Sequence, residues 1–329
     1  MINKTEQEIT STWNSQNSPS VSICCITYNH EKFISEAIDG FLMQKTTFPF
    51  EIIIGEDDST DNTLNIINKY RNRYPNLIQV ITSDSNVGMQ KNFERTFKAC
   101  QSRYIALCEG DDYWTDSYKL QKQITFLENN PEYSICCHMS ENYDEKSQTV
   151  ISHFPKIVHE TELTIFDLFN ANIAHTCTFV YRNKNVKIPP FFEKLQLADW
   201  PLHIIHAAYG KIKLLSDNMA RYRIHQNGVW SSINAIQQLD ASIMALNYID
   251  DFFQKKYSTH IQKSITRHIL EKALIYLDLN QPVEASQCYK ESSLHSKINS
   301  LYTSKYFIKK NLSFCYPLIS FIYRTVKRT

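Results

Sequence analysis

The chain has 329 residues, of which 43% are hydrophobic and 21% charged, and its formal net charge at pH 7 is +1. A chain of this size and composition can bury a substantial core, either as one large domain with an appendage or as two modest domains. Lysine plus arginine (35) nearly balances aspartate plus glutamate (34). This balance argues against a protein whose main function is to bind nucleic acid by neutralising its phosphates.

Several features favour a cytoplasmic protein. The nine cysteines are odd in number and show no C-x-x-C spacing, which favours reduced thiols. Residues 1–20 are polar and lack the apolar core of a signal peptide, so we expect a flexible N-terminal lead-in there. No run reaches the roughly 18 apolar residues that a membrane-spanning helix needs. FCYPLISFIY comes nearest, but it is short and contains Pro317.

The first half of the chain alternates between strand-like and helix-like patterns. The apolar runs VSICCITY, EIIIG, LIQVIT and RYIALC predict four strands, and apolar residues at helical spacing follow each run. Four such units in succession predict an α/β fold with a doubly wound, mostly parallel sheet of Rossmann type. Sheets of this kind bind ligands beyond the carboxyl ends of their strands.

The second half is mixed at first and then helical. SICCHM and HTCTFVY predict strands, and LADWPLHIIHAAYG predicts a helix. We therefore place the main domain at 21–232 and a C-terminal helical region at 233–329. Within that region, ALIYLDLNQPVEASQCYK resembles one tetratricopeptide-type helix-turn-helix. The basic, aromatic tail after it either lies on an anionic membrane surface at the inner face of the cell membrane or packs on the domain as a helix.

Polar residues follow three of the predicted strands. They are Thr27, Tyr28 and Asn29 after the first, Glu56, Asp57 and Asp58 after the second, and Glu109, Asp111 and Asp112 after the fourth. Two carboxylates about 4 Å apart would cost each other roughly 4 kcal/mol at an effective dielectric near 20. The last cluster therefore favours a Mg²⁺ or Mn²⁺ ion that is shared with substrate phosphates. The alternative is an acidic turn in which Asp112 caps the following helix.

Other candidate residues have two interpretations on local grounds. Asp57 suits either hydrogen bonds to a nucleotide or an Asx turn, and Asp199 suits either general-base chemistry or a helix N-cap. Arg223 and His225, in RYRIHQNGVWS, suit either a diphosphate or an ordinary basic loop. His175 is more typical of a hydrogen-bonded, partly buried histidine than of a catalyst.

Common nucleotide and hydrolase motifs are missing from the sequence. It contains no G-x-x-x-x-G-K-[ST] and no G-x-G-x-x-G, which removes the main support for kinase-like and dehydrogenase-like readings. The nucleophile elbow G-x-S-x-G is also missing. A nucleoside diphosphate would therefore be held by carboxylates and metal rather than by a glycine loop.

A set of ordered motifs carries a family resemblance. VSICCITYN, EIIIGEDDSTDNT, SNVGMQKNFERTF, YIALCEGDDYW, ADWPLH and YRIHQNGVWS together resemble the family 2 glycosyltransferases, which have the GT-A fold, are metal-dependent and invert the anomeric centre. The resemblance runs from about Val21 to Ser232. It implies transfer of a sugar, typically a hexose, from a nucleoside-diphosphate sugar to a glycan or lipid-linked glycan. It also implies Mn²⁺ or Mg²⁺ as cofactor and a role in bacterial surface polysaccharide synthesis (lipopolysaccharide, O-antigen or capsule).

The resemblance also implies a role for each candidate residue. Asp199 is the implied general base, and the implied metal ligands are Asp111, Asp112 and His225. The implied nucleotide-sugar-binding residues are Thr27, Tyr28, Asn29, Glu56, Asp57, Glu109, Asp111 and Arg223. Two motifs depart from the family pattern. In the turn where the family has Asp-Asp-Gly-Ser, Glu56 replaces the first Asp and Asp58 replaces the Gly. In the motif where the family has Asp-x-Asp, Glu109 replaces the first Asp.

Two other functions remain as alternatives. A sugar-nucleotide pyrophosphorylase also combines a doubly wound sheet with an acid-bound metal, but it ordinarily has a Gly-rich loop where this chain has ITYNHEKF. A non-catalytic glycan-binding protein on the same fold is the second alternative.

Overall fold

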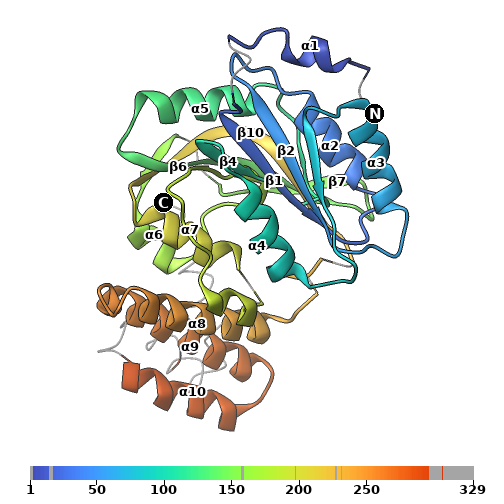
Figure 1. Ribbon diagram of the computed structural model, residues 1–329. Helices are drawn as coiled ribbons and strands as arrows, with labels where there is room; N and C mark the ends of the chain where they lie inside the picture. Colours follow the sequence, from blue (N-terminus) through green and yellow to red (C-terminus); the bar gives the residue numbers. More distant parts are fainter. Residues whose placement is uncertain are drawn as a thin grey trace. The chain divides into compact units, whose positions relative to one another are not determined.

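A computed structural model describes residues 3–14, 18–156, 159–196, 198–226, 228–230, 232–295 and 306. The chain divides into two compact units (Figure 1). The first comprises Met1–Lys194 and Ala198–Gly228, and the second comprises Leu195–Leu197 and Val229–Thr329.

The first unit begins with the predicted alternation of strands and helices. Its strands are β1 (Val21–Thr27), β2 (Phe50–Glu56), β3 (Ile78–Ile81) and β4 (Tyr104–Leu107). The helices that follow them are α2 (Ile34–Leu42), α3 (Thr63–Arg73), α4 (Met89–Ala99) and α5 (Lys119–Asn129). A short helix, α1 (Glu6–Thr10), precedes β1, so the segment expected to be a flexible lead-in is ordered in part. A capping box between Thr5 and Glu8 and the burial of Ile9 account for this order.

Ten strands form one mixed sheet: eight follow the order β3-β2-β1-β4-β9-β6-β10-β5, while β7 pairs with β6 and β8 pairs with β10. Strands β1 to β4 pair in parallel, as does β6 (Tyr133–Asp144) with β10 (Lys211–Ile224). Between these two groups, β9 (Val180–Arg182) is antiparallel to both of its neighbours. The remaining strands, β5 (Tyr113–Trp114), β7 (Thr149–Phe154) and β8 (Thr161–Leu163), pair antiparallel at its margins. The predicted α/β fold is confirmed, and its parallel character belongs chiefly to the N-terminal half.

Two segments differ from their sequence interpretation. RYRI, expected as part of a basic loop, is the end of β10, because Arg221 and Arg223 find acidic and aromatic partners within the sheet. HTCTFVY is divided between a 3₁₀ turn, η1 (Thr176–Thr178), and strand β9. The rest of this unit contains α6 (Ile165–Asn170), η2 (Pro190–Lys194) and α7 (Asp199–Ala207).

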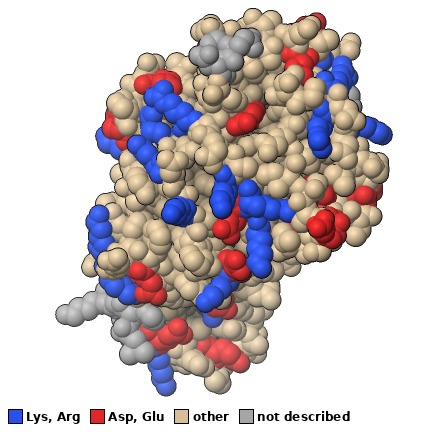
Figure 2. All heavy atoms as spheres, in the orientation of Figure 1, with Lys and Arg blue, Asp and Glu red and all other residues tan. Residues whose placement is uncertain are grey.

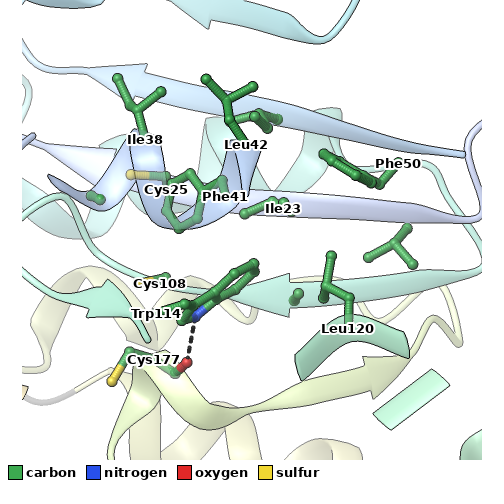
Figure 3. Packing of buried hydrophobic residues seen from close by; sticks show 14 of the residues in the cluster. Ile23, Cys25, Ile38, Phe41, Leu42, Phe50, Cys108, Trp114, Leu120 and Cys177 are labelled. Atoms are coloured by element: carbon green, nitrogen blue, oxygen red, sulfur yellow. Dashed lines mark hydrogen bonds between the residues drawn. The ribbon is translucent and has the colours of Figure 1, made fainter. Parts of the chain in front are cut away.

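A large core cluster covers one face of the sheet (Figure 3). It combines the inward residues of β1 and β2 with apolar residues of α2, α3 and α5. Trp114 packs edge-on against Phe41 and donates a 2.8 Å hydrogen bond from Nε1 to the carbonyl of Cys177. Since side chains alternate along a strand, the intervening residues of β1 and β2 face the other side, where α4 packs.

The second unit is helical. It contains α8 (Ala235–Phe252), α9 (Ser258–Asp278) and α10 (Pro282–His295), and α9 and α10 form the predicted helix-turn-helix. An open hollow of about 420 Å³ lies in this unit between residues of α8 and α9. Most of the basic, aromatic tail lies outside the described residues, but Tyr306 stacks on Tyr289 of α10 with ring centroids 4.5 Å apart.

Within the described ranges, no helix combines the length and the apolarity needed to cross a bilayer. Figure 2 shows lysine and arginine interspersed with acidic residues on the face drawn, as the balanced composition predicts. The eight cysteines in the described part of the chain are all buried and free of disulfides.

Candidate active site

The carboxyl ends of β1, β2 and β4 meet at one edge of the sheet. The backbone N–H of Asp57 donates to the carbonyl of Thr27 at 3.2 Å, and the N–H of Gly110 donates to the carbonyl of Ile26 at 2.9 Å. A Cβ atom on Gly110 would lie 2.7 Å from Thr27 Oγ1, so only glycine fits between Glu109 and Asp111. The chain thus carries the acids of the Glu109-Gly-Asp111 turn directly past the end of β1.

Asp111 lies beside two histidines. Its Oδ2 atom is 3.1 Å from Nε2 of His225 and 3.8 Å from Nε2 of His30, and its side chain is 24% exposed. Burial alone would raise the pKa of this carboxyl, but the charge at His30 and the hydrogen bond from His225 outweigh it and hold the pKa at about 2. The predicted pair Asp111 and His225 is therefore brought together, with His30 as an addition that the sequence did not single out.

Asp112 and Arg223 occupy a more enclosed position. Asp112 is 2% exposed, and its Oδ1 accepts a 2.9 Å hydrogen bond from the backbone N–H of Arg223. The Arg223 guanidinium forms ion pairs with Glu36 and Glu145 and lies over the ring of Tyr113. Both predicted ligand-binding residues thus already have partners within the protein: Asp112 accepts a backbone hydrogen bond, and Arg223 pairs with two carboxylates. Their roles toward a metal and a diphosphate stay predictions.

The turn after β2 is held by its own acids. Glu56 is buried and accepts hydrogen bonds from the N–H groups of Asp58 at 3.2 Å and Ser59 at 2.8 Å. Asp58, where the family pattern has glycine, adopts a left-handed conformation with φ of 59°. Asp57 is also buried, and its carboxylate accepts from the N–H groups of Val87 at 3.0 Å and Gly88 at 2.9 Å.

The remaining predicted nucleotide residues lie just past β1. Thr27 is buried, and its Oγ1 has no hydrogen-bond partner among the described residues. Tyr28 is 40% exposed. Asn29, with φ of 55°, ties the two strand ends together: its N–H donates to Ser59 Oγ at 2.9 Å and its Oδ1 accepts from the N–H of Thr60 at 2.8 Å. Arg95, which the sequence gave no reason to select, lies 3.5 Å from Asp57 and donates to the Glu56 carbonyl at 2.7 Å.

Asp199 is the first residue of α7, and both of its carboxylate oxygens are oriented by neighbours. Oδ2 accepts a 2.8 Å hydrogen bond from Thr176 Oγ1, and Oδ1 accepts one of 2.8 Å from the N–H of Trp200. The carboxylate is partly exposed, and burial raises its pKa against the opposing effect of these two bonds. An oriented carboxylate with a raised pKa is well suited to accept a proton.

The acids that follow β4 are linked electrostatically to the acid that begins α7. Burial is the main cause of the raised pKa of Glu109, and the charges of Asp112, Asp111 and Asp199 raise it further. Burial and the charge of Asp111 likewise raise the pKa of Asp112. Acids from two distant parts of the sequence therefore share one electrostatic site.

The side chains at this edge fit a divalent cation only in part. In the described part of the chain, no group of three or more His, Cys, Asp and Glu side chains is arranged to hold a metal ion. Asp111 and His225 nevertheless offer one oxygen and one nitrogen 3.1 Å apart, a donor set that suits a cation completed by substrate phosphates. Asp112 offers less, since one of its oxygens is already bound to backbone.

Comparison with known proteins identifies the family. Residues 22–187 match the model of the family described as Glycosyl transferase family 2. An uncharacterised protein of Mycobacterium tuberculosis is 40% identical over 217 residues, a match that covers 64% of this chain and 61% of that protein. An Escherichia coli protein, the UDP-Glc:alpha-D-GlcNAc-diphosphoundecaprenol beta-1,3-glucosyltransferase WfaP, is 30% identical over 67% of this chain and 82% of its own length.

Solved structures share the fold at low sequence identity. TarS of S. aureus in complex with UDP-GlcNAc superposes with a TM-score of 0.59 at 20% identity, covering 83% of this chain and 79% of that chain. The mannosyltransferase PcManGT of Pyrobaculum calidifontis, in complex with GDP-Man and Mn²⁺, gives a TM-score of 0.56 at 12% identity, covering 96% and 89%. The sheet, the ordered motifs and the family match agree, and the chain belongs to glycosyl transferase family 2.

Proposed function

We propose that this protein transfers a sugar, typically a hexose, from a nucleoside-diphosphate donor to an acceptor hydroxyl, with inversion at the anomeric carbon. The observation that carries the proposal is an electrostatic link: the charge of Asp199, far away in the sequence, helps to raise the pKa of Glu109, which stands two residues before Asp111 of the Asp111–His225 pair. One end of this site suits a charged diphosphate, and the other offers an oriented base.

In the proposed reaction Asp199 accepts the proton of the acceptor hydroxyl while that oxygen forms its bond to the anomeric carbon. The bond between the sugar and the diphosphate breaks on the opposite side, which gives inversion. Thr176 and the N–H of Trp200 keep the two carboxylate oxygens in place, so that little reorganisation is needed for proton transfer.

Asp111 and His225 are the residues that would hold a Mn²⁺ or Mg²⁺ ion. Such an ion, when bound, supplies electrostatic stabilisation to a leaving diphosphate. The solved structure of PcManGT, which is described with GDP-Man and Mn²⁺, supports this assignment by fold likeness. We further propose that Thr27, Asn29 and Asp57 shape the nucleotide end of the site, because they join the ends of β1 and β2.

For the acceptor we propose a glycan or lipid-linked glycan of a bacterial surface polysaccharide. The support is the E. coli relative, whose name specifies a diphosphoundecaprenol-linked acceptor. Contact of the tail with the membrane surface would suit such an acceptor. Sedimentation of the full chain and of a chain ending at Leu301 with anionic liposomes tests this contact, and equal binding of the two would remove the tail from the account.

Donor cleavage tests the proposed reaction and separates it from the two alternatives. UDP-glucose, UDP-N-acetylglucosamine and GDP-mannose would be incubated with the protein, with and without Mn²⁺, and the released products identified. Nucleoside diphosphate that appears only with Mn²⁺ supports glycosyl transfer, pyrophosphate-dependent chemistry supports the pyrophosphorylase, and no turnover supports a binding protein. The variants Asp111→Asn and Asp199→Asn, each shown to be folded, should no longer release nucleoside diphosphate. Near-normal release by both would overturn the assignment.

A further inference from the structure

Tyr222 on β10 has no part in the mechanism above, yet its chain neighbour and its stacking partner connect it to both ends of the site. Its ring stacks on His175 with centroids 4.1 Å apart and an interplanar angle of 4°. Within the described residues, its hydroxyl makes no hydrogen bond. The ring is therefore fixed in place while its polar group remains available to a ligand.

Chain connectivity ties Tyr222 to both ends of the site. The next residue along β10, Arg223, donates its backbone N–H to Asp112 at 2.9 Å. On the other side, His175 is followed directly by Thr176, whose hydroxyl binds Asp199 at 2.8 Å. Tyr222 thus stacks on the chain neighbour of Thr176, which binds the proposed base, and is itself adjacent to Arg223, which binds the acidic turn.

His175 is itself held rigidly. His175 Nδ1 is hydrogen-bonded to Ser140 Oγ at 2.8 Å, and the same hydroxyl lies 3.3 Å from the carbonyl of Phe154. The ring of Phe154 packs on the imidazole at 4.9 Å. Burial lowers the pKa of His175 to about 4, and the imidazole is neutral near pH 7. A neutral ring fixed at its nitrogen and on its face serves as a platform for Tyr222.

The charges around Tyr222 favour its role as a donor. Burial is the largest cause of its raised pKa, and the four acids Asp112, Asp111, Glu109 and Asp199 raise it further. The phenol therefore keeps its proton throughout the neutral range and can donate it in a hydrogen bond. The same coupling places the hydroxyl within electrostatic reach of both ends of the site.

We propose that the Tyr222 hydroxyl donates a hydrogen bond to a hydroxyl group of the sugar being transferred, and that His175 positions it by stacking. The proposal rests on the proposed glycosyl transfer. In that reaction the sugar lies between its leaving diphosphate and the attacking acceptor, and Tyr222 is connected to the acidic turn through Arg223 and to the proposed base through His175 and Thr176. Tyr222 would then contribute to the choice of donor sugar but not to the binding of the nucleotide.

Binding of a nucleotide sugar, compared with binding of the corresponding nucleoside diphosphate, tests the proposal. Calorimetric titration with Mn²⁺ would use UDP-glucose, UDP-N-acetylglucosamine and GDP-mannose against UDP and GDP. Since a hydrogen bond contributes about 0.5–1.5 kcal/mol, Tyr222→Phe should weaken binding of the preferred nucleotide sugar roughly 2- to 10-fold and leave the diphosphates unchanged. Tyr143→Phe is the matched control, because its hydroxyl bonds to Gln148 in the β6–β7 hairpin.

A double-mutant cycle tests the positioning role of His175. If His175 acts through the phenol, His175→Ala should weaken sugar-nucleotide binding, and adding it to Tyr222→Phe should cause little further loss. Unchanged sugar-nucleotide binding in Tyr222→Phe, or equal weakening of the diphosphates, would overturn the inference while the proposed function stands. A wild-type protein that binds none of the five ligands would overturn both.

Discussion

Thr176 Oγ1 donates a 2.8 Å hydrogen bond to Asp199 Oδ2 across 23 residues of sequence. The bond links the 3₁₀ turn η1 to the first residue of α7, and it opposes the effect of burial on the pKa of Asp199. Thr176 thus helps to orient the proposed base and to set its pKa, which makes Thr176 the most direct route to testing the proposed chemistry.

Thr176→Val should reduce turnover while keeping the shape of the side chain. A hydrogen bond to a charged group contributes about 1.5–3 kcal/mol, so we expect kcat to fall roughly 10- to 100-fold. The measurement is the rate of nucleoside diphosphate release at a saturating concentration of the UDP or GDP sugar. Thr178→Val is the control, since its hydroxyl bonds to the His175 carbonyl in the same turn and does not bind Asp199. Equal losses in both variants would mean that the turn, rather than the base, had been disturbed.

The pH profile of transfer should report the raised pKa of Asp199. Because the base must be ionised, activity should fall as the pH decreases through a pKa that lies above the ordinary value for aspartate, about 3.9. Thr176→Val removes a bond that favours the ionised form, so its acid limb should move to higher pH than that of the wild type. The profile of kcat between pH 4.5 and 8 measures both effects, and an unshifted limb in the variant would contradict the tuning role.

Asp199→Asn should abolish transfer and yet make the protein more stable at neutral pH. The raised pKa means that ionised Asp199 destabilises the folded state above the pKa, and the amide removes that charge beside Glu109. The amide oxygen can still accept from Trp200 N–H, and its nitrogen can donate to Thr176 Oγ1. We expect a roughly 10²- to 10⁴-fold loss of kcat. The melting temperature of the variant should exceed that of the wild type at pH 7.5, by a margin that shrinks as the pH falls. A variant that melts below the wild type at pH 7.5 would refute this prediction.

Arg223→Lys should separate a packing role from a diphosphate role. The planar guanidinium reaches both Glu36 and Glu145 while lying over Tyr113, and a lysine cannot reproduce this geometry. We expect a loss of about 1–3 kcal/mol in the free energy of unfolding by urea, with UDP or GDP affinity retained at a temperature where the variant is folded. Retained stability with weakened diphosphate binding would instead favour the role implied by the family resemblance.

The sequence predicted those parts of the fold and site that depend on local patterns. The runs around Ile23, Ile53 and Ala106 are continuously apolar because these strands are covered on both faces, and the acids after them follow from strand ends. Strand β10 was not predicted, since Arg221 and Arg223 are typical of a solvent-exposed loop unless their partners in the sheet are known.

Long-range contacts account for what the sequence could not supply at the site. Thr176 meets Asp199, and His30 meets Asp111, only after the chain has folded. The polar segment that follows β1 was a usable signal for His30, whereas Thr176 lies in HTCTFVY, a stretch whose pattern predicts only a strand. Asp199 itself was selected by family resemblance, because on local grounds a helix cap is the default interpretation.

Lys119 gives a prediction about stability that is independent of catalysis. Its side chain is 0% exposed, its Nζ lies 4.1 Å from the centroid of the Trp114 ring, and it donates a 2.8 Å hydrogen bond to Gln123 Oε1. Burial lowers the pKa of this amine to about 8 from the ordinary 10.5. The charged form is therefore disfavoured in the folded state, whereas the unfolded chain holds its proton up to about 10.4.

Stability should consequently rise with pH relative to a variant without the amine. Between pH 8 and 10.5 the unfolded chain binds more protons than the folded one, so the free energy of unfolding increases there, by about 3 kcal/mol for a shift of this size. Urea titrations of wild type and Lys119→Met at pH 7.5, 9 and 10.5 measure this, because other titrating groups contribute equally to both proteins and cancel in the difference. A difference that stays constant over this range would show that Lys119 titrates like an exposed lysine and that its amine reaches water.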